Sequence, residues 1–238
     1  MPMIVIPDIH GRPFWRPVAA EAAGKEHIVF LGDYLDPYPF EGIDYEEARG
    51  ELLDILRLKV RYPEGVTLLL GNHDLHYLDY DIAGSRYDAV HRREIQRILE
   101  DNFDLFHMAF EETIDGKRYL LSHAGILGGW LREHAPLFGG VPSGELVDFL
   151  NRIWWTPDAR RPFLKALSDI PEERGGTRPY GSMVWADLRE HSLVRDEIPG
   201  CYQVFGHSQV KEPVITPYFA CLDCRKAFRI SEDGITAI

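Results

Sequence analysis

The chain is poor in cysteine and contains no long hydrophobic run. Cys201, Cys221 and Cys224 are its three cysteines, so an even-numbered disulfide framework is excluded. No apolar stretch approaches the roughly 20 residues of a membrane-spanning helix. The opening residues lack the basic and apolar regions of a signal peptide. These absences predict a soluble, cytoplasmic protein with no membrane contact.

Positive charge is also scarce, since 26 Lys and Arg face 38 Asp and Glu and the formal net charge is -12. Such a chain repels a polyanion at long range, so we expect no nucleic-acid grip. Low-complexity tracts and internal repeats are absent from the sequence, which excludes disordered and solenoid architectures. The 45% apolar fraction predicts a single domain over residues 1–238 and leaves the oligomeric state open.

Short apolar runs in the first third of the chain predict buried strands that end in polar loops. These runs cover residues 3–7, 27–31 and 66–70. Between the second and the third, Asp44 and Glu47 form the pattern of a capping box at the start of a crossover helix. This order predicts a partly parallel sheet, with ligands bound beyond the carboxyl ends of its strands.

The rest of the chain mixes helical and strand patterns. Residues 89–101 predict an amphipathic helix. Asp115-Gly116 predicts a hairpin turn, and a later strand covers 202–205. Residues 126–177 combine helical spacing with many prolines and glycines, which favours a helical or irregular insertion or lid over the site.

Polar side chains at the strand ends have the composition of a dinuclear metal site. The candidate metal ligands are Asp8, His10, Asp33, Asn72, His123 and His207. Hard divalent ions take carboxylate, amide and imidazole ligands, and two ions about 3.5–4 Å apart need a bridging ligand such as Asp33. A lone loop histidine is better explained as a satisfied polar residue. Five such loops, each after an apolar run, favour one shared site.

The same residues carry a resemblance to a known family. DIHG at residues 8–11, GDYLD at 32–36, GNHD at 71–74, SHAG at 122–125 and GH at 206–207 resemble the five motifs of calcineurin-like metallophosphoesterases. The phosphoprotein phosphatase branch, including its bacterial members, is the most similar, and Val184-Trp185 resembles its tryptophan segment. The resemblance extends from Asp8 to about Ile230.

The resemblance implies an α/β fold, α+β in some schemes: a four-layer αββα sandwich of two mixed β-sheets flanked by helices. It assigns Asp8, His10 and Asp33 to the first metal, and adds Asn72, His123 and His207 with Asp33 at the second. It implies attack on phosphorus by a metal-bridging hydroxide, with His73 as general acid and Asp36 orienting it. Two divalent metal ions are expected, with Mn²⁺ preferred and Fe, Zn²⁺ or Ni²⁺ as alternatives.

One departure from the family pattern concerns phosphate binding. The phosphatase branch usually has Arg-Gly after the carboxylate that Asp36 matches, and the arginine clamps the phosphate. Here Pro37-Tyr38 stands instead. Arg12 and Arg189 are candidate substitutes, although an ordinary surface position explains either equally well. The missing clamp leaves the identity of the substrate open.

Several residues outside the motifs have less specific interpretations. Asp74 suits either a helix cap or a partner of the ligand loops. The remaining histidines are expected to be surface or packing residues; they are His76, His91, His107, His134 and His191. Buried thiols explain Cys221 and Cys224 better than a zinc site does, because too few further ligands are available.

The sequence therefore predicts a metal-dependent phosphomonoesterase acting on a phosphorylated small molecule, nucleotide or phosphoprotein. A nucleotide or dinucleotide pyrophosphohydrolase, or a phosphodiesterase, is the alternative, because an open pocket at the same site admits diesters. A non-catalytic scaffold of the same fold is a third hypothesis. The presence of Asp36, Asn72 and His73 argues against the scaffold, since such relatives tend to lose these residues.

Overall fold

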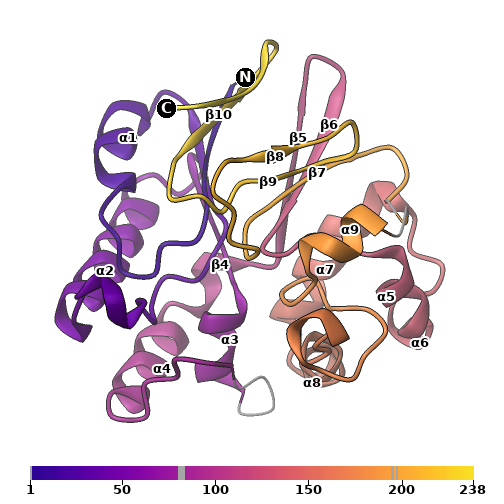
Figure 1. Ribbon diagram of the computed structural model, residues 1–238, viewed down its shortest axis with the longest axis horizontal. Coiled ribbons are helices and arrows are strands. Elements are labelled where there is room, and N and C mark those ends of the chain that lie inside the picture. Colours follow the sequence, from indigo (N-terminus) through magenta and orange to yellow (C-terminus); the bar gives the residue numbers. More distant parts are fainter. Residues whose placement is uncertain (1, 80–83, 194–195, 197) are drawn as a thin grey trace. The chain divides into compact units, whose positions relative to one another are not determined.

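The structure is a computed structural model that describes residues 2–79, 84–193, 196 and 198–238 (Figure 1). It divides into two compact units, Met1–His107 with Arg225–Ile238, and Met108–Cys224. Each unit contains one mixed sheet and its own helices, which confirms the α/β class. The single-domain expectation remains a prediction. In the described part of the chain, no helix is both long and apolar enough to cross a membrane.

The first unit is built on a six-stranded sheet in the order β11-β10-β1-β2-β3-β4. Its strands are β1 (Met3–Ile6), β2 (His27–Phe30), β3 (Val66–Leu69), β4 (Phe106–His107), β10 (Phe228–Ser231) and β11 (Gly234–Ala237). β1 to β4 run parallel to one another, and β10 pairs antiparallel with β1. The three predicted strands are confirmed, and their carboxyl ends lie along one edge of the sheet.

Helices cover this sheet because their apolar faces are buried against it. The helices are α1 (Trp15–Ala22), α2 (Tyr45–Arg61), α3 (Asn72–Leu78) and α4 (Arg92–Asp101), with short 3-10 turns at η1 (Pro39–Glu41) and η3 (Phe103–Leu105). Figure 1 shows α1 and α2 along the same flank of the strands. The capping box is confirmed, since Asp44 accepts from the Glu47 N–H at 2.9 Å and donates its own N–H to Glu47 at 3.0 Å.

The helix predicted at 89–101 begins three residues later, at Arg92. The Asp88 carboxylate accepts the N–H groups of Val90 and His91 at 2.9 Å and holds them in a turn. An acidic side chain that binds nearby backbone donors competes with helix formation, which explains the later start.

The second unit contains a five-stranded sheet in the order β5-β6-β7-β9-β8. Its strands are β5 (Ala109–Ile114), β6 (Lys117–Ser122), β7 (Tyr202–Phe205), β8 (Val214–Ile215) and β9 (Phe219–Cys221). Asp115 and Gly116 both have positive φ, at 49° and 73°, as the predicted hairpin turn requires. β6 and β7 are parallel neighbours, so the residues that follow them emerge side by side.

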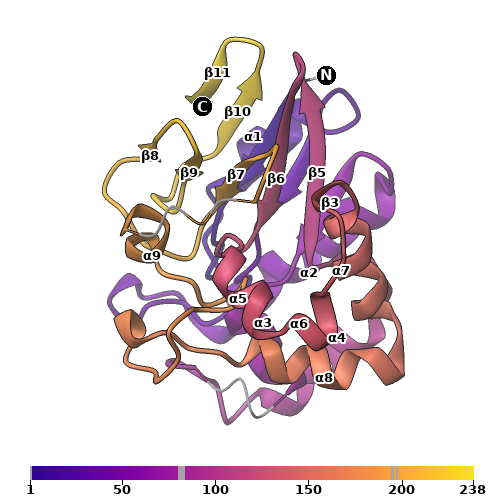
Figure 2. The same ribbon diagram turned by 90° about the vertical axis from the view of Figure 1, so that its right-hand side faces the viewer.

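The segment expected as an insertion, 126–177, forms most of the helical part of the second unit. Its helices are α5 (Gly128–Glu133), α6 (Ala135–Phe138), α7 (Leu146–Trp155) and α8 (Pro157–Leu167), with 3-10 turns at η4 (Ser143–Glu145) and η5 (Glu172–Arg174). Helix α9 (Leu188–Leu193) follows this segment. Figure 2 shows α6, α7 and α8 gathered together, and α7 packs on α8 and β5. Buried Trp130, Trp154 and Phe163 supply their core, and a lid role for this segment remains a prediction.

Candidate active site

The loops after β1 and β2 are joined by their backbones. Asp8 and His10 follow β1, and Asp33 follows β2. The N–H groups of Ile9 and His10 both donate to the Asp33 carbonyl, at 3.1 and 2.7 Å. His10 and Asp33 adopt positive φ values of 46° and 54°. Parallel pairing of the two strands thus brings three of the predicted metal ligands to one place.

The geometry of these three side chains and the protonation state of His10 fit a divalent cation. Their ligand atoms all lie within 4.8 Å of one another, and all three residues are buried. His10 Nδ1 donates to the Leu35 carbonyl at 2.8 Å, so Nε2 carries the lone pair and lies 3.6 Å from Asp33 Oδ2. Burial lowers the pKa of His10 well below its ordinary value, which keeps the ring in its ligand form.

Two carboxylates share this buried space, which is unfavourable without a cation. Burial and the neighbouring charge of Asp8 raise the pKa of Asp33 well above its ordinary value. A bound dication would offset that repulsion and favour the charged form of Asp33. The donor set therefore suits a metal better than it suits water or a hydrogen-bonded core.

Asn72 and Asp74 open α3 at the end of β3. The Asp74 carboxylate accepts three backbone N–H groups, from Gly71 at 2.8 Å, Asp33 at 2.8 Å and Tyr34 at 3.0 Å. It is therefore both a helix cap and a partner of the β2 loop, and the two interpretations from the sequence both apply. By holding the Asp33 backbone, Asp74 sets the position of the expected bridging ligand.

His73 and Asp36 form the predicted pair. His73 Nδ1 lies 2.8 Å from Asp36 Oδ2, and the His73 backbone N–H donates to Asp33 Oδ1 at 2.9 Å. The His73 and His10 rings meet edge to face with their centroids 5.2 Å apart. The expected proton donor therefore lies next to His10, one of the predicted metal ligands.

Two further α3 residues contact Asp36: His76, which was expected to be a surface or packing residue, and Tyr77, which no sequence pattern identified. The Tyr77 hydroxyl donates to Asp36 Oδ1, and His76 Nε2 lies 2.7 Å from Asp36 Oδ2. His76 is fully buried, and it belongs to the site rather than to ordinary packing. Positions 73, 76 and 77 lie on one face of a helix, so their spacing was the available signal. Although burial opposes it, hydrogen bonds from His73 and His76 lower the pKa of Asp36.

The protonation state of His73 follows from its surroundings. Burial is the main effect that lowers its pKa, to about 4, and the charge of Arg86 adds to it, while Asp36 raises it. The ring is thus neutral near pH 7, with Nδ1–H donating to Asp36 and Nε2 accepting from Arg86 Nη2 at 2.9 Å. A phosphate dianion close to Nε2 would raise this pKa and supply the charge that an imidazolium needs.

The second unit contributes a pair of buried histidines at the ends of β6 and β7. His123 Nε2 lies 3.1 Å from His207 Nδ1. The Gly206 N–H donates to the His123 carbonyl at 2.8 Å, and His207 has a positive φ of 60°. Two imidazoles at this distance are suitable ligands for one divalent ion. The structure thus brings these two predicted ligands together.

Side-chain contacts from Arg174 and Cys221 hold the loop that contains His207. Arg174 donates to Ser208 Oγ at 2.7 Å and pairs with Asp187 at 3.1 Å, which fixes the loop after His207. Cys221 Sγ is buried and contacts the carbonyl groups of Gly206 and Ser208, so it acts as a packing thiol. These contacts position the loop backbone rather than the reacting atoms.

Backbone strain marks the predicted site residues. Of seven non-glycine residues with positive φ in the described ranges, four are site candidates: His10, Asp33, Asp36 and His207. Such conformations cost free energy, and they concentrate where function requires a fixed direction for a side chain. Arg86 also has a positive φ, at 64°. Sequence patterns did not identify this residue as a site candidate, because it lies in an irregular segment after α3.

The two arginines proposed from the sequence occupy different settings. Arg12 is buried, with Nε bonded to both Glu41 oxygens at 3.0 and 3.1 Å and Nη1 bonded to the Asp8 carbonyl at 3.3 Å. Arg189 is exposed on α9, and its backbone N–H donates to Asp187 at 2.9 Å. Neither guanidinium contacts His73 or Asp36, whereas that of Arg86 contacts both.

The fold and these side chains define a metal-dependent phosphoesterase. Residues 1–211 match the family model described as calcineurin-like phosphoesterase, so the chain belongs to this family of hydrolases. The family uses two metal ions, and the buried Asp and His groups are consistent with that requirement.

Individual relatives are more distant. The symmetrical bis(5'-nucleosyl)-tetraphosphatase of Nitrosomonas europaea is 23% identical over 84% of this chain and 80% of its own length. A cold-active protein tyrosine phosphatase has a TM-score of 0.62 at 13% identity, over 99% of this chain and 75% of that one. A protein serine/threonine phosphatase from Saccharomyces cerevisiae has a TM-score of 0.52 at 13% identity, over 98% and 73%. The structural similarity confirms the predicted fold.

Proposed function

We propose that the chain is a cytoplasmic phosphomonoesterase that uses two divalent ions, with Mn²⁺ as the preferred metal and Fe, Zn²⁺ or Ni²⁺ as alternatives. In this proposal the ligands are Asp8, His10, Asp33, Asn72, His123 and His207. One observation carries the proposal: the His73–Asp36 pair lies beside the cluster of Asp8, His10 and Asp33. The ring centroids of His73 and His10 are 5.2 Å apart.

The ions, when bound, supply Lewis acidity and make a strong nucleophile available at neutral pH. The side chains of this protein orient the proton donor and supply the proton to the leaving oxygen. Asp36 fixes the His73 ring through Nδ1, so that Nε2 faces the leaving oxygen. Once the bound phosphate has raised the pKa of the ring, Nε2 takes up a proton from solvent and donates it to that oxygen as its bond to phosphorus breaks. Tyr77 and His76 hold Asp36 in turn, so the ring direction is fixed by several bonds.

The test is phosphate release from an aryl phosphate by protein loaded separately with each metal. We expect turnover with Mn²⁺ that a chelator abolishes and added Mn²⁺ restores. Absence of turnover on aryl monoesters and diesters with all of Mn²⁺, Fe²⁺, Zn²⁺, Co²⁺ and Ni²⁺ would refute the proposal.

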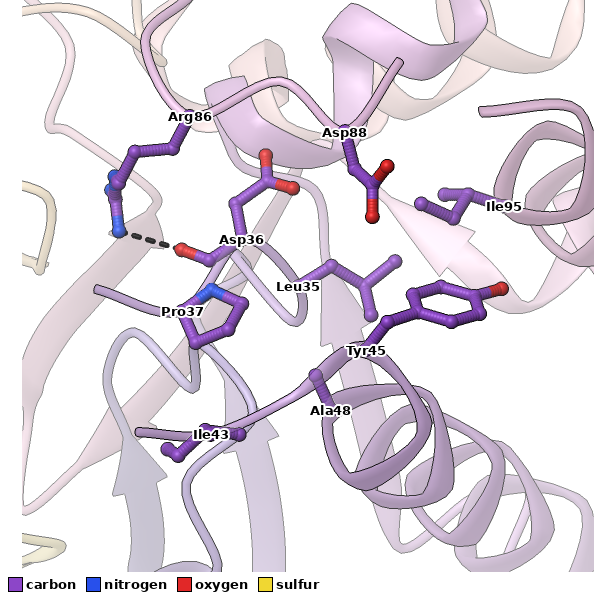
Figure 3. Close-up of a pocket in the computed structure, with 9 residues that line it drawn as sticks. All are labelled: Leu35, Asp36, Pro37, Ile43, Tyr45, Ala48, Arg86, Asp88 and Ile95. Carbon is purple, nitrogen blue, oxygen red and sulfur yellow. Dashed lines mark hydrogen bonds between the residues drawn. The ribbon is translucent and has the colours of Figure 1, made fainter. Parts of the chain in front are cut away.

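A second candidate is hydrolysis of a dinucleoside polyphosphate or another pyrophosphate. A cavity of about 290 Å³ beside Asp36 supports it, with Leu35, Ile43 and Tyr45 among the residues that form its walls (Figure 3). The relative from Nitrosomonas europaea acts on a bis(5'-nucleosyl) tetraphosphate by its name. Comparing kcat/KM on an aryl phosphate, a phosphopeptide and a dinucleoside tetraphosphate distinguishes the two candidates.

A further inference from the structure

The guanidinium of Arg86 contacts both members of the His73–Asp36 pair. Nη1 donates to the Asp36 carbonyl at 2.6 Å, a bond that Figure 3 shows, and Nη2 donates to His73 Nε2 at 2.9 Å. Nε2 is the atom that must meet the leaving oxygen in the proposed function. The Arg86 guanidinium therefore lies at the position that a substrate phosphate has to approach.

The Tyr38 ring holds this guanidinium from one side. Arg86 Cζ lies 3.7 Å from the Tyr38 ring centroid, well within the distance of a cation–π contact. The same ring meets His10 edge to face, with centroids 5.3 Å apart. Tyr38 thus links the arginine to the metal-ligand loop, and it stands in the Pro37-Tyr38 pair that replaces the expected arginine.

The charge of Arg86 is available for an anion. Within the described residues Arg86 forms no ion pair with a carboxylate, whereas Arg12 pairs with Glu41 at 3.0 Å. Arg86 is half-buried, so solvent and substrate can reach it. A guanidinium that is not paired with a carboxylate can donate charge-assisted hydrogen bonds to phosphate oxygens.

We propose that Arg86 is the phosphate-binding arginine of this site and that Tyr38 is its positioning residue. When substrate enters, Nη2 exchanges its bond with His73 Nε2 for a bond to a phosphoryl oxygen. That exchange frees Nε2 to face the leaving oxygen. The inference rests on the proposed function for the place of the phosphate, but it also predicts oxyanion binding that can be measured without turnover.

The first experiment measures orthophosphate and tungstate binding by calorimetry on Mn²⁺-loaded protein, together with metal content, KM and kcat. Arg86→Ala should weaken oxyanion binding and raise KM at least about 10-fold, as expected for a lost charged hydrogen bond. Arg86→Lys should recover part of the affinity, because it keeps the charge without the planar fork. Arg93→Ala, which removes the same charge from an exposed position on α4, is the control and should stay within about twofold.

A second pair of variants tests the role of Tyr38. Tyr38→Ala should weaken oxyanion binding about threefold to tenfold, the range of a partly exposed cation–π contact. Tyr38→Phe keeps the ring and should recover most of that loss. Recovery would show that the Tyr38 ring acts by stacking against Arg86, and not through a general effect on the loop.

Each outcome decides the proposal. Unchanged oxyanion affinity in Arg86→Ala, with metal content equal to wild type, would overturn it. Tighter binding and faster turnover would also overturn it, by showing that the guanidinium obstructs the site. Weaker oxyanion binding in Arg86→Ala, together with a wild-type protein that hydrolyses no phosphoester, would support Arg86 as the phosphate-binding residue and reject the proposed function.

Discussion

The first and second units hold their candidate ligands in different ways. In the first, Asp8 and Asp33 share a buried space with His10, and ionisable groups contact one another directly. In the second, His123 and His207 lie 3.1 Å apart on loops held by backbone bonds and by the side chain of Arg174. Buried carboxylates therefore concentrate in the first unit, while the second unit contributes a pair of imidazoles to the candidate ligand set. Substitutions in the two units should therefore have different effects.

The largest difference should appear on removing one ligand from each unit. Asp33→Asn removes the carboxylate expected to bridge, so both ions should be lost and kcat/KM should fall at least about 10³-fold. His207→Ala should remove one ion and leave the first partly bound. Elemental analysis of the purified variants measures both predictions. Equal metal loss in the two variants would contradict the bridging role.

The proton donor should matter without affecting metal content. His73→Asn is expected to lower kcat about 10²-fold to 10⁴-fold, with a larger loss for alkyl than for nitrophenyl esters, because poor leaving groups need the proton more. His134→Asn is a matched control, since His134 pairs with Asp169 at 2.6 Å in the second unit. Loss of metal in His73→Asn, or the same loss of kcat for both ester types, would refute the assignment.

A smaller effect is expected for the hydroxyl that supports Asp36. Tyr77→Phe removes the donor to Asp36 Oδ1, and kcat should fall about 10-fold, the lower end for a group that orients a catalytic residue. KM should remain close to wild type, since Tyr77 binds Asp36 rather than substrate. A higher KM with unchanged kcat would place Tyr77 in substrate binding instead.

The smallest effect concerns acid stability in the second unit. Burial lowers the pKa of His191 to about 4 from its ordinary 6.5, although its bond to the Ala124 carbonyl acts in the opposite direction. The unfolded chain therefore binds a proton between these values that the folded chain does not. The stabilising contribution is complete above pH 6.5 and is lost as the pH falls toward 4, by about 2 kcal/mol at pH 5.

His191→Gln keeps a donor for Ala124 and removes the titration. Urea unfolding of wild type and variant at pH 7 and pH 5 measures the difference. The variant should lose about 2 kcal/mol less free energy of unfolding between the two values. Parallel losses in the two proteins would show that His191 takes up its proton in the folded state.

The sequence predicted the strands, and the loops that bear the candidate ligands, because these loops come directly after apolar runs. Asp8 after β1 and Asp33 after β2 are examples. Parallel pairing then brings such loops to one edge of the sheet, and local patterns are sufficient to place them. The hairpin at Asp115 and the capping box at Asp44 were predictable for the same reason, since both depend on neighbours in the chain.

The contacts that the sequence did not reveal depend on partners distant in the chain. His76 meets Asp36 across 40 residues, and Arg86 meets it across 50. A histidine at helical spacing also fits ordinary packing, so periodicity alone did not assign His76. Arg86 lies in an irregular segment with a left-handed backbone, which no local pattern of residue types identifies.

The most direct test of the account is metal stoichiometry measured together with phosphate release on one preparation of the protein. We predict two ions per chain after loading with Mn²⁺, and hydrolysis of an aryl phosphate that rises with occupancy and disappears after chelation. Full occupancy by two ions without hydrolysis of any phosphoester, or hydrolysis that persists in the metal-free protein, would contradict it.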